Sequence, residues 1–252
     1  MKLSDHAAVN RASWNVEAPN WVEPARRDWA APDPSWGIYG VPESEVGALP
    51  DVDGADVVEL GCGTAYFSAW LARRGARPTG VDVAEMQLAT AREMQDEHGI
   101  HFPLLHASAE AVPLPDACAD LVLSEYGASL WCDPEAWIAE AARLLRPGGQ
   151  LVFLTNHLLV ALTAPPTCAC GDRLVRDLRG LRVVTFPDDD AIEFHISHGE
   201  WIDVLRRNGL AVTGLHELYA PDHADPTRYD WITPEWARRW PMEEIWTARM
   251  SL

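Results

Sequence analysis

Basic charge is scarce in this sequence, and the scarcity limits the kinds of partner that the protein can bind. Lys2 is the only lysine, and the 20 lysines and arginines face 38 aspartates and glutamates, so the formal net charge is −18 at pH 7. A surface this acidic repels the phosphates of nucleic acids and the anionic head groups of lipids. We therefore expect neither nucleic acid nor a membrane among the partners.

Long apolar runs and paired cysteines are also missing. No apolar run in the sequence is long enough to cross a bilayer, and the N-terminal segment lacks the continuous hydrophobic stretch of a secretory signal. The number of cysteines is odd, and their spacing fits neither a disulfide framework nor a zinc site. They are Cys62, Cys118, Cys132, Cys168 and Cys170. These absences predict a cytoplasmic protein without a metal ion.

Short apolar segments alternate with amphipathic ones through most of the chain. Strands are predicted at 56–60, 78–83, 102–106, 120–124 and 150–156, with two closing strands at 210–219 and 245–250. Helices are predicted at 64–74, 84–98, 134–145 and 199–208. This repeated order of strand and helix predicts an open, mostly parallel α/β sheet with helices on both faces.

The strongest local motif is the glycine-rich turn Glu59-Leu60-Gly61-Cys62-Gly63. It follows a predicted strand and precedes a helix, which is where α/β sheets bind nucleotide-like ligands. Glycine at positions 61 and 63 lets the backbone approach a ligand closely. Asp82 ends the next strand, 19 residues after Gly63, where a carboxylate can accept two hydrogen bonds from a ribose.

Two residues around this turn distinguish between possible cofactors. Dinucleotide-binding enzymes have a third glycine where this chain has Tyr66. Glu59, two residues before Gly61, would repel a phosphate but suits the positively charged amino group of a methionine. An adenosyl amino acid is therefore favoured over NAD. An NAD-linked oxidoreductase and a non-catalytic cofactor-binding protein remain the alternatives.

Three longer segments resemble class I S-adenosylmethionine-dependent methyltransferases. VVELGCGTAYFSAWLARRGARPTGVDV resembles their motif I and the acidic loop after it. SAEAVPLPDACADLVLSEYGASLW resembles their adenine-binding loop and fourth strand, and LLRPGGQLVFL resembles the approach to their fifth strand. The resemblance covers about residues 55–156. It implies a Rossmann-like sheet of seven strands with the last strand antiparallel, and S-adenosyl-L-methionine as cofactor with S-adenosyl-L-homocysteine as product.

The resemblance also implies a single methyltransferase domain over residues 1–252. Residues 1–45, rich in tryptophan and proline, would form a helical lid, and residues 46–156 the cofactor-binding half. Residues 157–198 would form a small insertion on the substrate side, with an arginine-rich helix at DRLVRDLRG and a hairpin made by RVVTF and AIEFHI. Residues 199–252 would supply the last helix and the closing strands.

Twelve cofactor-binding residues follow from the resemblance. They are Trp14, Trp21, Glu59, Gly61, Cys62, Gly63, Asp82, Val83, Gln87, Ala109, Glu110 and Glu125. Asp82 would bind the ribose, and Ala109 and Glu110 would flank the adenine. Many relatives have an aspartate where this chain has Ser108, so a hydroxyl or a water must take that adenine contact here. Structural alternatives are a tight turn at the two glycines and a helix cap at Asp82.

Methyl transfer from a sulfonium requires mainly alignment of the reacting atoms, and a base only if the acceptor loses a proton. His157, at the end of the fifth predicted strand, is the best-placed base by topology, although a surface histidine is the alternative. Tyr126, after the fourth strand, is the second catalytic candidate. We expect a small-molecule acceptor, and His195 and His198 as structural or substrate-lining residues rather than metal ligands.

Overall fold

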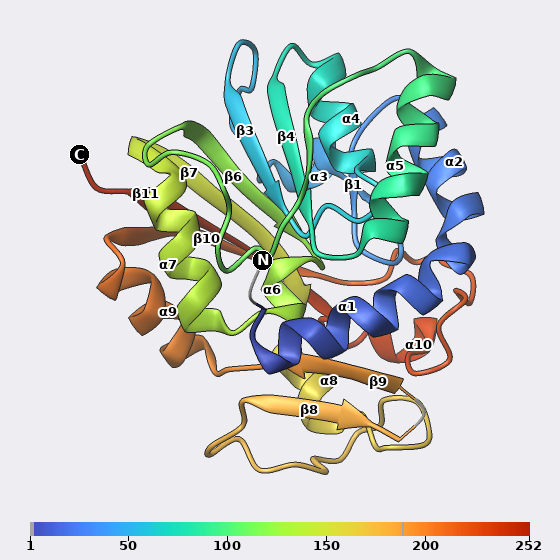
Figure 1. Cartoon of the computed structure of the whole chain (residues 1–252). Helices are drawn as coiled ribbons and strands as arrows, with labels where there is room; N and C mark the ends of the chain where they lie inside the picture. The colour runs from blue at the N-terminus through green and yellow to red at the C-terminus, as the bar shows by residue number, and fades with distance from the viewer. Residues whose placement is uncertain (1–2, 188) are drawn as a thin grey trace.

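Seven strands form one mixed sheet at the centre of the computed structural model, which describes residues 3–187 and 189–252 (Figure 1). In chain order they are β3 (Asp56–Leu60), β4 (Arg77–Asp82), β5 (Leu104–His106), β6 (Ala119–Glu125), β7 (Leu145–Asn156), β10 (Leu210–Leu218) and β11 (Glu243–Met250). Their order across the sheet is β10-β11-β7-β6-β3-β4-β5, and β11 is antiparallel to both neighbours. The predicted seven-stranded sheet with an antiparallel last strand is confirmed.

Helices cover both faces of this sheet (Figure 1). They are α4 (Tyr66–Arg73) and α5 (Glu85–His98) on one face, and α7 (Pro134–Leu144) and α9 (His198–Arg207) on the other. Along β7, Val152 and Leu154 pack in the cluster that contains α4 residues, whereas Leu151 and Phe153 pack against α7 and α9. This alternation buries both faces, as parallel strands require. No helix among the described residues is long and apolar enough to cross a bilayer.

Local sequence signals fix where the covering helices begin. Asp133 accepts hydrogen bonds from the first backbone N–H groups of α7, and Pro134 occupies the first turn of that helix. Ser197 and Glu200 form a reciprocal capping box at the start of α9. These caps satisfy backbone donors that a helix leaves unpaired, and they explain why both predicted helices begin within two residues of the expected position.

The N-terminal segment lies across the carboxyl ends of the central strands. It contains α1 (Asp5–Glu17), the 3₁₀ helix η1 (Ala18–Trp21), α2 (Val22–Ala30), the short hairpin of β1 (Ser35–Trp36) and β2 (Val41–Pro42), and α3 (Glu43–Val46). The helical character of this lid agrees with the prediction, whereas the β1–β2 hairpin was not expected. The remaining short helices are α6 (Ala128–Trp131), α8 (Leu158–Thr163) and α10 (Pro234–Ala237).

The insertion after β7 contains the predicted hairpin, formed by β8 (Val183–Phe186) and β9 (Asp189–Phe194). The arginine-rich helix predicted at residues 172–180 was wrong, because that segment has no regular structure. The backbone N–H of Val175 bonds to the carbonyl of Leu162, and Arg176 donates to the carbonyls of Ala161 and Ala164. The segment therefore caps the end of α8 instead of forming hydrogen bonds within itself.

A buried amide joins the lid to the insertion. Asn10 on α1 donates to the carbonyl oxygens of Trp131 (2.8 Å) and Ile192 (3.0 Å), and its Oδ1 accepts from the backbone N–H of Ile192 (2.7 Å). Ile192 belongs to β9, and α1 packs along this strand (Figure 1). Asn10 thus fixes α1 to the hairpin, and together the two elements cover one end of the sheet.

We predict that Asn10→Ala loosens this cover without unfolding the sheet. The substitution leaves two partly buried backbone groups of Ile192 unpaired. An unpaired group costs about 1–3 kcal/mol when it is fully buried, so we expect values at the lower end of this range. Hydrogen–deuterium exchange should become about tenfold faster or more in α1 and β9, and should stay slow in β3 and β6. Asn208→Ala, which removes an amide bonded within the end of α9, is the control. Unchanged exchange in α1 would contradict the role of Asn10.

Candidate cofactor and acceptor cavity

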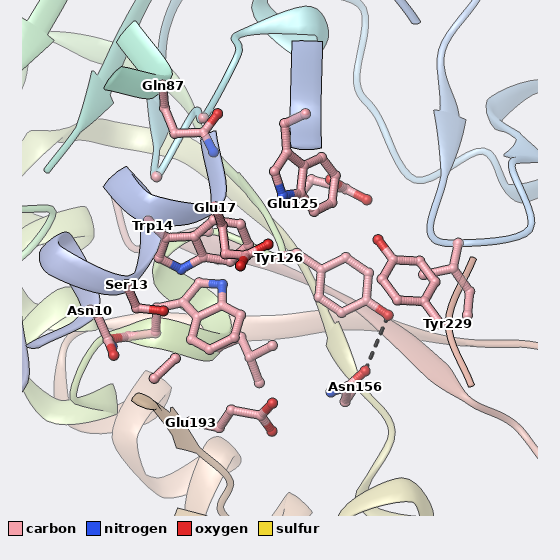
Figure 2. A pocket seen from close by; sticks show the side chains of 18 of the residues that line it. Asn10, Ser13, Trp14, Glu17, Gln87, Glu125, Tyr126, Asn156, Glu193 and Tyr229 are labelled. Carbon is pink, nitrogen blue, oxygen red and sulfur yellow. Dashed lines mark hydrogen bonds between the residues drawn. The ribbon is translucent and has the colours of Figure 1, made fainter. Parts of the chain in front are cut away.

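A cavity of about 1700 Å³ opens at the carboxyl ends of β3, β4, β6 and β7, beneath the lid and beside the insertion (Figure 2). This edge of an α/β sheet is where ligands bind, because the loops after the strands leave a crevice there. Eleven of the twelve predicted cofactor-binding residues line it, as do Tyr126 and Ser108. The residues that the sequence pattern placed at one site therefore do meet in space.

The two glycines of the turn have different physical roles. Gly61 has φ +74°, and a Cβ atom there would lie 2.5 Å from the Cα of Gly127, so the packing of the chain itself requires glycine. Gly63 has φ +53°, and a Cβ there would meet no atom within 4 Å. The tight-turn interpretation thus explains Gly61, whereas Gly63 borders open space in the cavity and leaves room for a ligand.

Asp82 is held against this turn by the backbone. Its Oδ2 accepts a hydrogen bond from the N–H of Gly63 and its Oδ1 accepts one from the N–H of Ala84, each at 2.7 Å. Burial raises the pKa of the carboxyl group, and these backbone bonds oppose the rise. Each oxygen keeps a further lone pair, so the carboxylate can still accept hydrogen bonds from a ligand in the cavity.

Glu59 is a buried carboxylate on the cavity wall, with 3 % of its surface exposed. It accepts hydrogen bonds from the backbone N–H (2.9 Å) and the hydroxyl of Ser68. Burial raises the pKa of Glu59 to about 8 despite these bonds, and the nearby carboxylates of Glu125 and Asp82 raise it further. A positively charged ligand group beside Glu59 would favour its ionised form.

Glu125 and Tyr126 follow β6 and face the same cavity (Figure 2). Glu125 accepts hydrogen bonds from the hydroxyl of Tyr66 and from the backbone N–H of Gly37 (3.3 Å), and burial raises its pKa to about 7. The hydroxyl of Tyr126 donates to Oε1 of Glu243 at 2.5 Å and lies 3.1 Å from Oδ1 of Asn156. Tyr66, the residue that replaces the third glycine of the dinucleotide motif, therefore contributes to the wall beside Glu125.

Glu110 is the one predicted cofactor-binding residue that does not line the cavity. Its carboxylate accepts hydrogen bonds from the hydroxyl of Ser4 (2.9 Å) and the backbone N–H of Asp133 (3.0 Å), and it pairs with His6. These contacts tie the start of the lid to the start of α7. The carboxylate of Glu110 therefore has a structural role, and the place of this residue beside the adenine stays a prediction.

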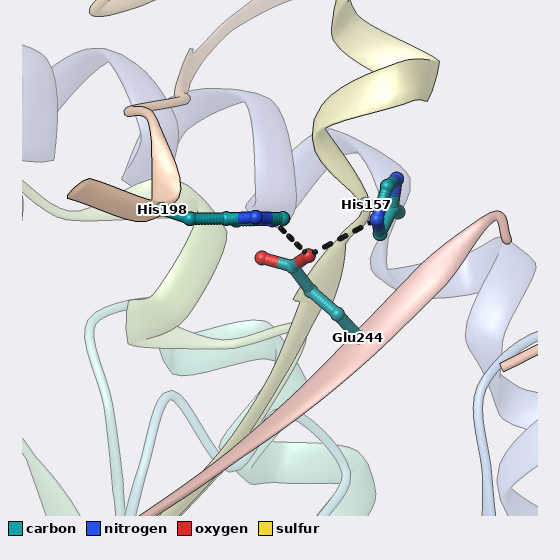
Figure 3. Close-up of side chains that lie close together, drawn as sticks. All are labelled: His157, His198 and Glu244. Carbon is teal, nitrogen blue, oxygen red and sulfur yellow. Dashed lines mark hydrogen bonds and ion pairs between the residues drawn. The ribbon is translucent and has the colours of Figure 1, made fainter. Parts of the chain in front are cut away.

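His157 also lies outside the cavity, so the structure does not support its predicted role as the base. It is buried, and its Nδ1 accepts a hydrogen bond from the backbone N–H of Leu159 (3.1 Å), which caps α8. Its Nε2 has no hydrogen-bond partner among the described residues and lies 3.3 Å from Glu217 and 3.6 Å from Glu244. Glu244 accepts a hydrogen bond from His198 at 2.7 Å (Figure 3). His157 thus belongs to a cluster that joins β7, α9 and β11.

The donor atoms of His157, His198 and Glu244 lie within 4.8 Å of one another, as the ligands of a metal ion would. The hydrogen bond at Nδ1 of His157 argues against a metal there. A neutral imidazole carries one N–H, and because Nδ1 accepts a bond, the hydrogen must be on Nε2, which then has no lone pair for a metal. We interpret the cluster as two histidines bridged by a buried carboxylate.

The cavity holds a histidine that the sequence analysis did not propose as a base. His195 Nε2 lies 2.7 Å from Oε2 of Glu193, and both residues line the cavity. They are two positions apart at the end of β9, and residues two apart on a strand share a face. That period was visible in the sequence. Of His195 and His198, which were expected to be structural or substrate-lining, only His195 is among the described residues that line the cavity.

Known proteins show similarity to this chain along its central half. A model of the family described as "Methyltransferase domain" matches residues 58–153. Malonyl-[acyl-carrier protein] O-methyltransferase from Serratia marcescens is 42% identical over 103 residues, which cover 40% of this chain and 38% of that protein. Phosphatidylethanolamine N-methyltransferase from Cereibacter sphaeroides is 32% identical over 139 residues, which cover 54% of this chain and 68% of that protein.

A solved structure extends the similarity to most of the chain. An S-adenosylmethionine-dependent methyltransferase from Mesorhizobium loti superposes with a TM-score of 0.68 at 28% identity, over 84% of this chain and 100% of that one. The alignments with the first curated relatives span about two fifths of their length. The strand order, the turn and these similarities define a methyltransferase fold. The chain belongs to the class I S-adenosylmethionine-dependent methyltransferases, and its cofactor is S-adenosylmethionine.

The two glycines give a matched pair of substitutions. We predict that Gly61→Ala lowers the free energy of unfolding by about 3 kcal/mol, because a left-handed backbone costs about 1–2 kcal/mol and the backbone clash adds about 1–3 kcal/mol. Gly63→Ala should cost about 1 kcal/mol but should weaken S-adenosylhomocysteine binding. Chemical denaturation and calorimetric titration measure the two effects. Equal losses of stability would contradict the assignment.

The His198–Glu244 pair predicts a pH dependence of stability. The hydrogen bond to Glu244 raises the pKa of His198, so its stabilisation is complete below the unfolded value of about 6.5 and is lost as the pH rises through the folded value. The melting temperature of His198→Gln should therefore lie furthest below that of the wild type in mild acid and approach it in alkali.

Two other histidines bear on this measurement. Burial lowers the pKa of His157, and the charge of His198 lowers it further, so the difference between the two proteins reports on His198 together with its effect on His157. His223→Gln, which changes an exposed histidine, is the control. A melting-temperature difference that stays constant between mildly acidic and alkaline pH would show that the pair makes no pH-dependent contribution.

Proposed function

We propose that this chain catalyses methyl transfer from S-adenosylmethionine to a small-molecule acceptor by in-line displacement. The observation that carries the proposal is the arrangement of Gly63 and Asp82, in which open space lies beside a carboxylate held by two backbone N–H groups. This arrangement suits a ribose, whose two hydroxyls can donate to Asp82. S-adenosylmethionine supplies a methyl group on a positively charged sulfur that leaves as a neutral thioether.

The remaining cavity residues fit the other parts of the cofactor. Glu59 offers a negative charge at the end of β3, next to the turn, where the amino group of the methionine would lie. Gln87 and Ala109 line the wall near Asp82, where the adenosine would extend. We propose that these residues bind the cofactor and that Trp14 of the lid helps to exclude water from it.

Catalysis then depends mainly on positioning. The side chains of Tyr126, just after β6, and Asn156, at the end of β7, lie 3.1 Å apart. His195 and Glu193 lie on the insertion (Figure 2 labels Glu193). These groups surround the space in which an acceptor would be aligned. Similar proteins are named as O-methyltransferases and as an N-methyltransferase, so the acceptor atom has to be inferred from the cavity.

The test is binding of S-adenosylhomocysteine to variants of Asp82. We predict that Asp82→Ala raises the dissociation constant about 30-fold, because hydrogen bonds to a charged group contribute about 1.5–3 kcal/mol each. Calorimetric titration measures this, and Asp96→Ala, an exposed position outside the cavity, is the control. Asp82→Asn, with folding checked by circular dichroism, separates lost binding from a disturbed turn. Unchanged affinity, or tight binding of NADH in place of S-adenosylhomocysteine, would refute the proposal.

A further inference from the structure

Carboxylates outnumber cationic side chains in the cavity wall. Two arginines line it, Arg27 and Arg228, and eight acidic residues do so. The acidic residues are Glu17, Asp28, Glu59, Asp82, Glu125, Asp190, Glu193 and Asp230. S-adenosylmethionine carries a sulfonium, an ammonium and a carboxylate, so it compensates for one net negative charge. The remaining excess of acidic over basic residues in the cavity wall predicts that a second positively charged ligand binds in the same cavity.

Topology places the acceptor at the part of the cavity after β6 and β7. The ends of β4, β3, β6 and β7 are neighbours across the sheet in that order. Asp82 at the end of β4 and the glycine turn after β3 are the proposed cofactor sites, so the free part of this edge lies beyond them. Glu125, Tyr126 and Asn156 end the two strands there and line the cavity.

Two carboxylates at this end of the cavity, those of Glu125 and Glu243, form no ion pair with the described residues. Glu125 has hydrogen bonds from Tyr66 and Gly37, and no arginine or histidine of the described residues forms an ion pair with it. Behind it, Glu243 is 0 % exposed. Its Oε1 accepts hydrogen bonds from the hydroxyl of Tyr126 (2.5 Å) and the backbone N–H of Ile38 (2.8 Å), whereas its Oε2 has no hydrogen-bond partner in the part of the chain that the structure describes. Oε2 lies against Gly37, whose N–H binds Glu125.

Aromatic rings at the same end can hold a cation. Tyr126 and Tyr229 face the space beside Glu125 (Figure 2). The guanidinium of Arg228 lies 4.8 Å from the ring centre of Trp21 and 5.8 Å from that of Tyr229, and both rings line the cavity. The rings of this wall therefore already contact one positive group of the chain. Carboxylates combined with aromatic faces are the surroundings in which proteins recognise ammonium groups.

We propose that the acceptor is a basic amine that enters as an ammonium ion, binds to Glu125 among these rings and is methylated on nitrogen. The proposal rests on the proposed methyl transfer, and it moves Glu125 from the predicted cofactor-binding residues to the acceptor. The amine gives one proton to Glu125, and its freed lone pair forms the nitrogen–carbon bond while the carbon–sulfur bond breaks and its electron pair goes to sulfur. The product is a methylated amine, and the proton passes from Glu125 to solvent.

The experiment compares three ligands of one shape on the S-adenosylhomocysteine-loaded protein. They are phenethylamine, phenethyl alcohol and hydrocinnamate, and isothermal titration measures their dissociation constants. We expect the amine to bind at least tenfold more tightly than the alcohol, and the carboxylate to bind most weakly. Any other order, including equal or undetectable binding of all three, overturns the proposal. Failure of S-adenosylhomocysteine to bind would instead refute the proposed function, independently of this order.

Glu125→Gln tests the assigned carboxylate, because it removes the charge and keeps an acceptor for Tyr66. Amine affinity should fall at least tenfold while alcohol affinity changes little, and Glu93→Gln, an exposed carboxylate outside the cavity, should change neither. The pKa of Glu125 is about 7, so wild-type amine affinity should fall as the pH drops through that value. This inflection should be absent in Glu125→Gln. Retained amine affinity in Glu125→Gln would overturn the assignment.

Discussion

The hydrogen bond from the backbone N–H of Gly63 to Asp82 joins the ends of β3 and β4, and the geometry of the cavity depends on it. The turn needs a left-handed backbone at Gly63, and the carboxylate fixes that backbone from the neighbouring strand. The same carboxylate accepts from Ala84 just before α5, so one side chain orients a turn and a helix start together. A ligand that binds Asp82 therefore meets a carboxylate whose orientation is already set.

The sheet and this turn were predictable because their signals are local in the sequence. The apolar run before Gly61, the glycines and the acid at the end of the next strand lie within 27 residues of one another (56–82). Together they can be recognised without knowledge of contacts to distant segments. The caps at Asp133 and Ser197 are equally local. Signals of this kind predicted the order of elements and the part of the cavity wall around the glycine turn.

The contacts that the sequence did not predict are those between distant segments. Glu110 was assigned to the adenine by resemblance, but Ser4 and His6 from the other end of the chain take its carboxylate. His157 follows the expected strand, yet its ring caps α8 and lies near Glu244 on β11. Neither partner could be found from spacing, because hydrogen bonds between distant segments have no sequence period.

The acidic residues of the chain have different physical effects in the cavity wall and on the surface. On the surface, carboxylates are hydrated and mainly repel other anions. In the cavity wall, Glu59 and Glu125 have lost water without gaining a cation, and burial raises the pKa of each toward neutrality. A cationic ligand offsets the free-energy cost of ionising these buried carboxylates, because their negative charge attracts its positive charge. The same buried carboxylates that are costly in the free protein thus provide selectivity for cations over neutral and anionic molecules.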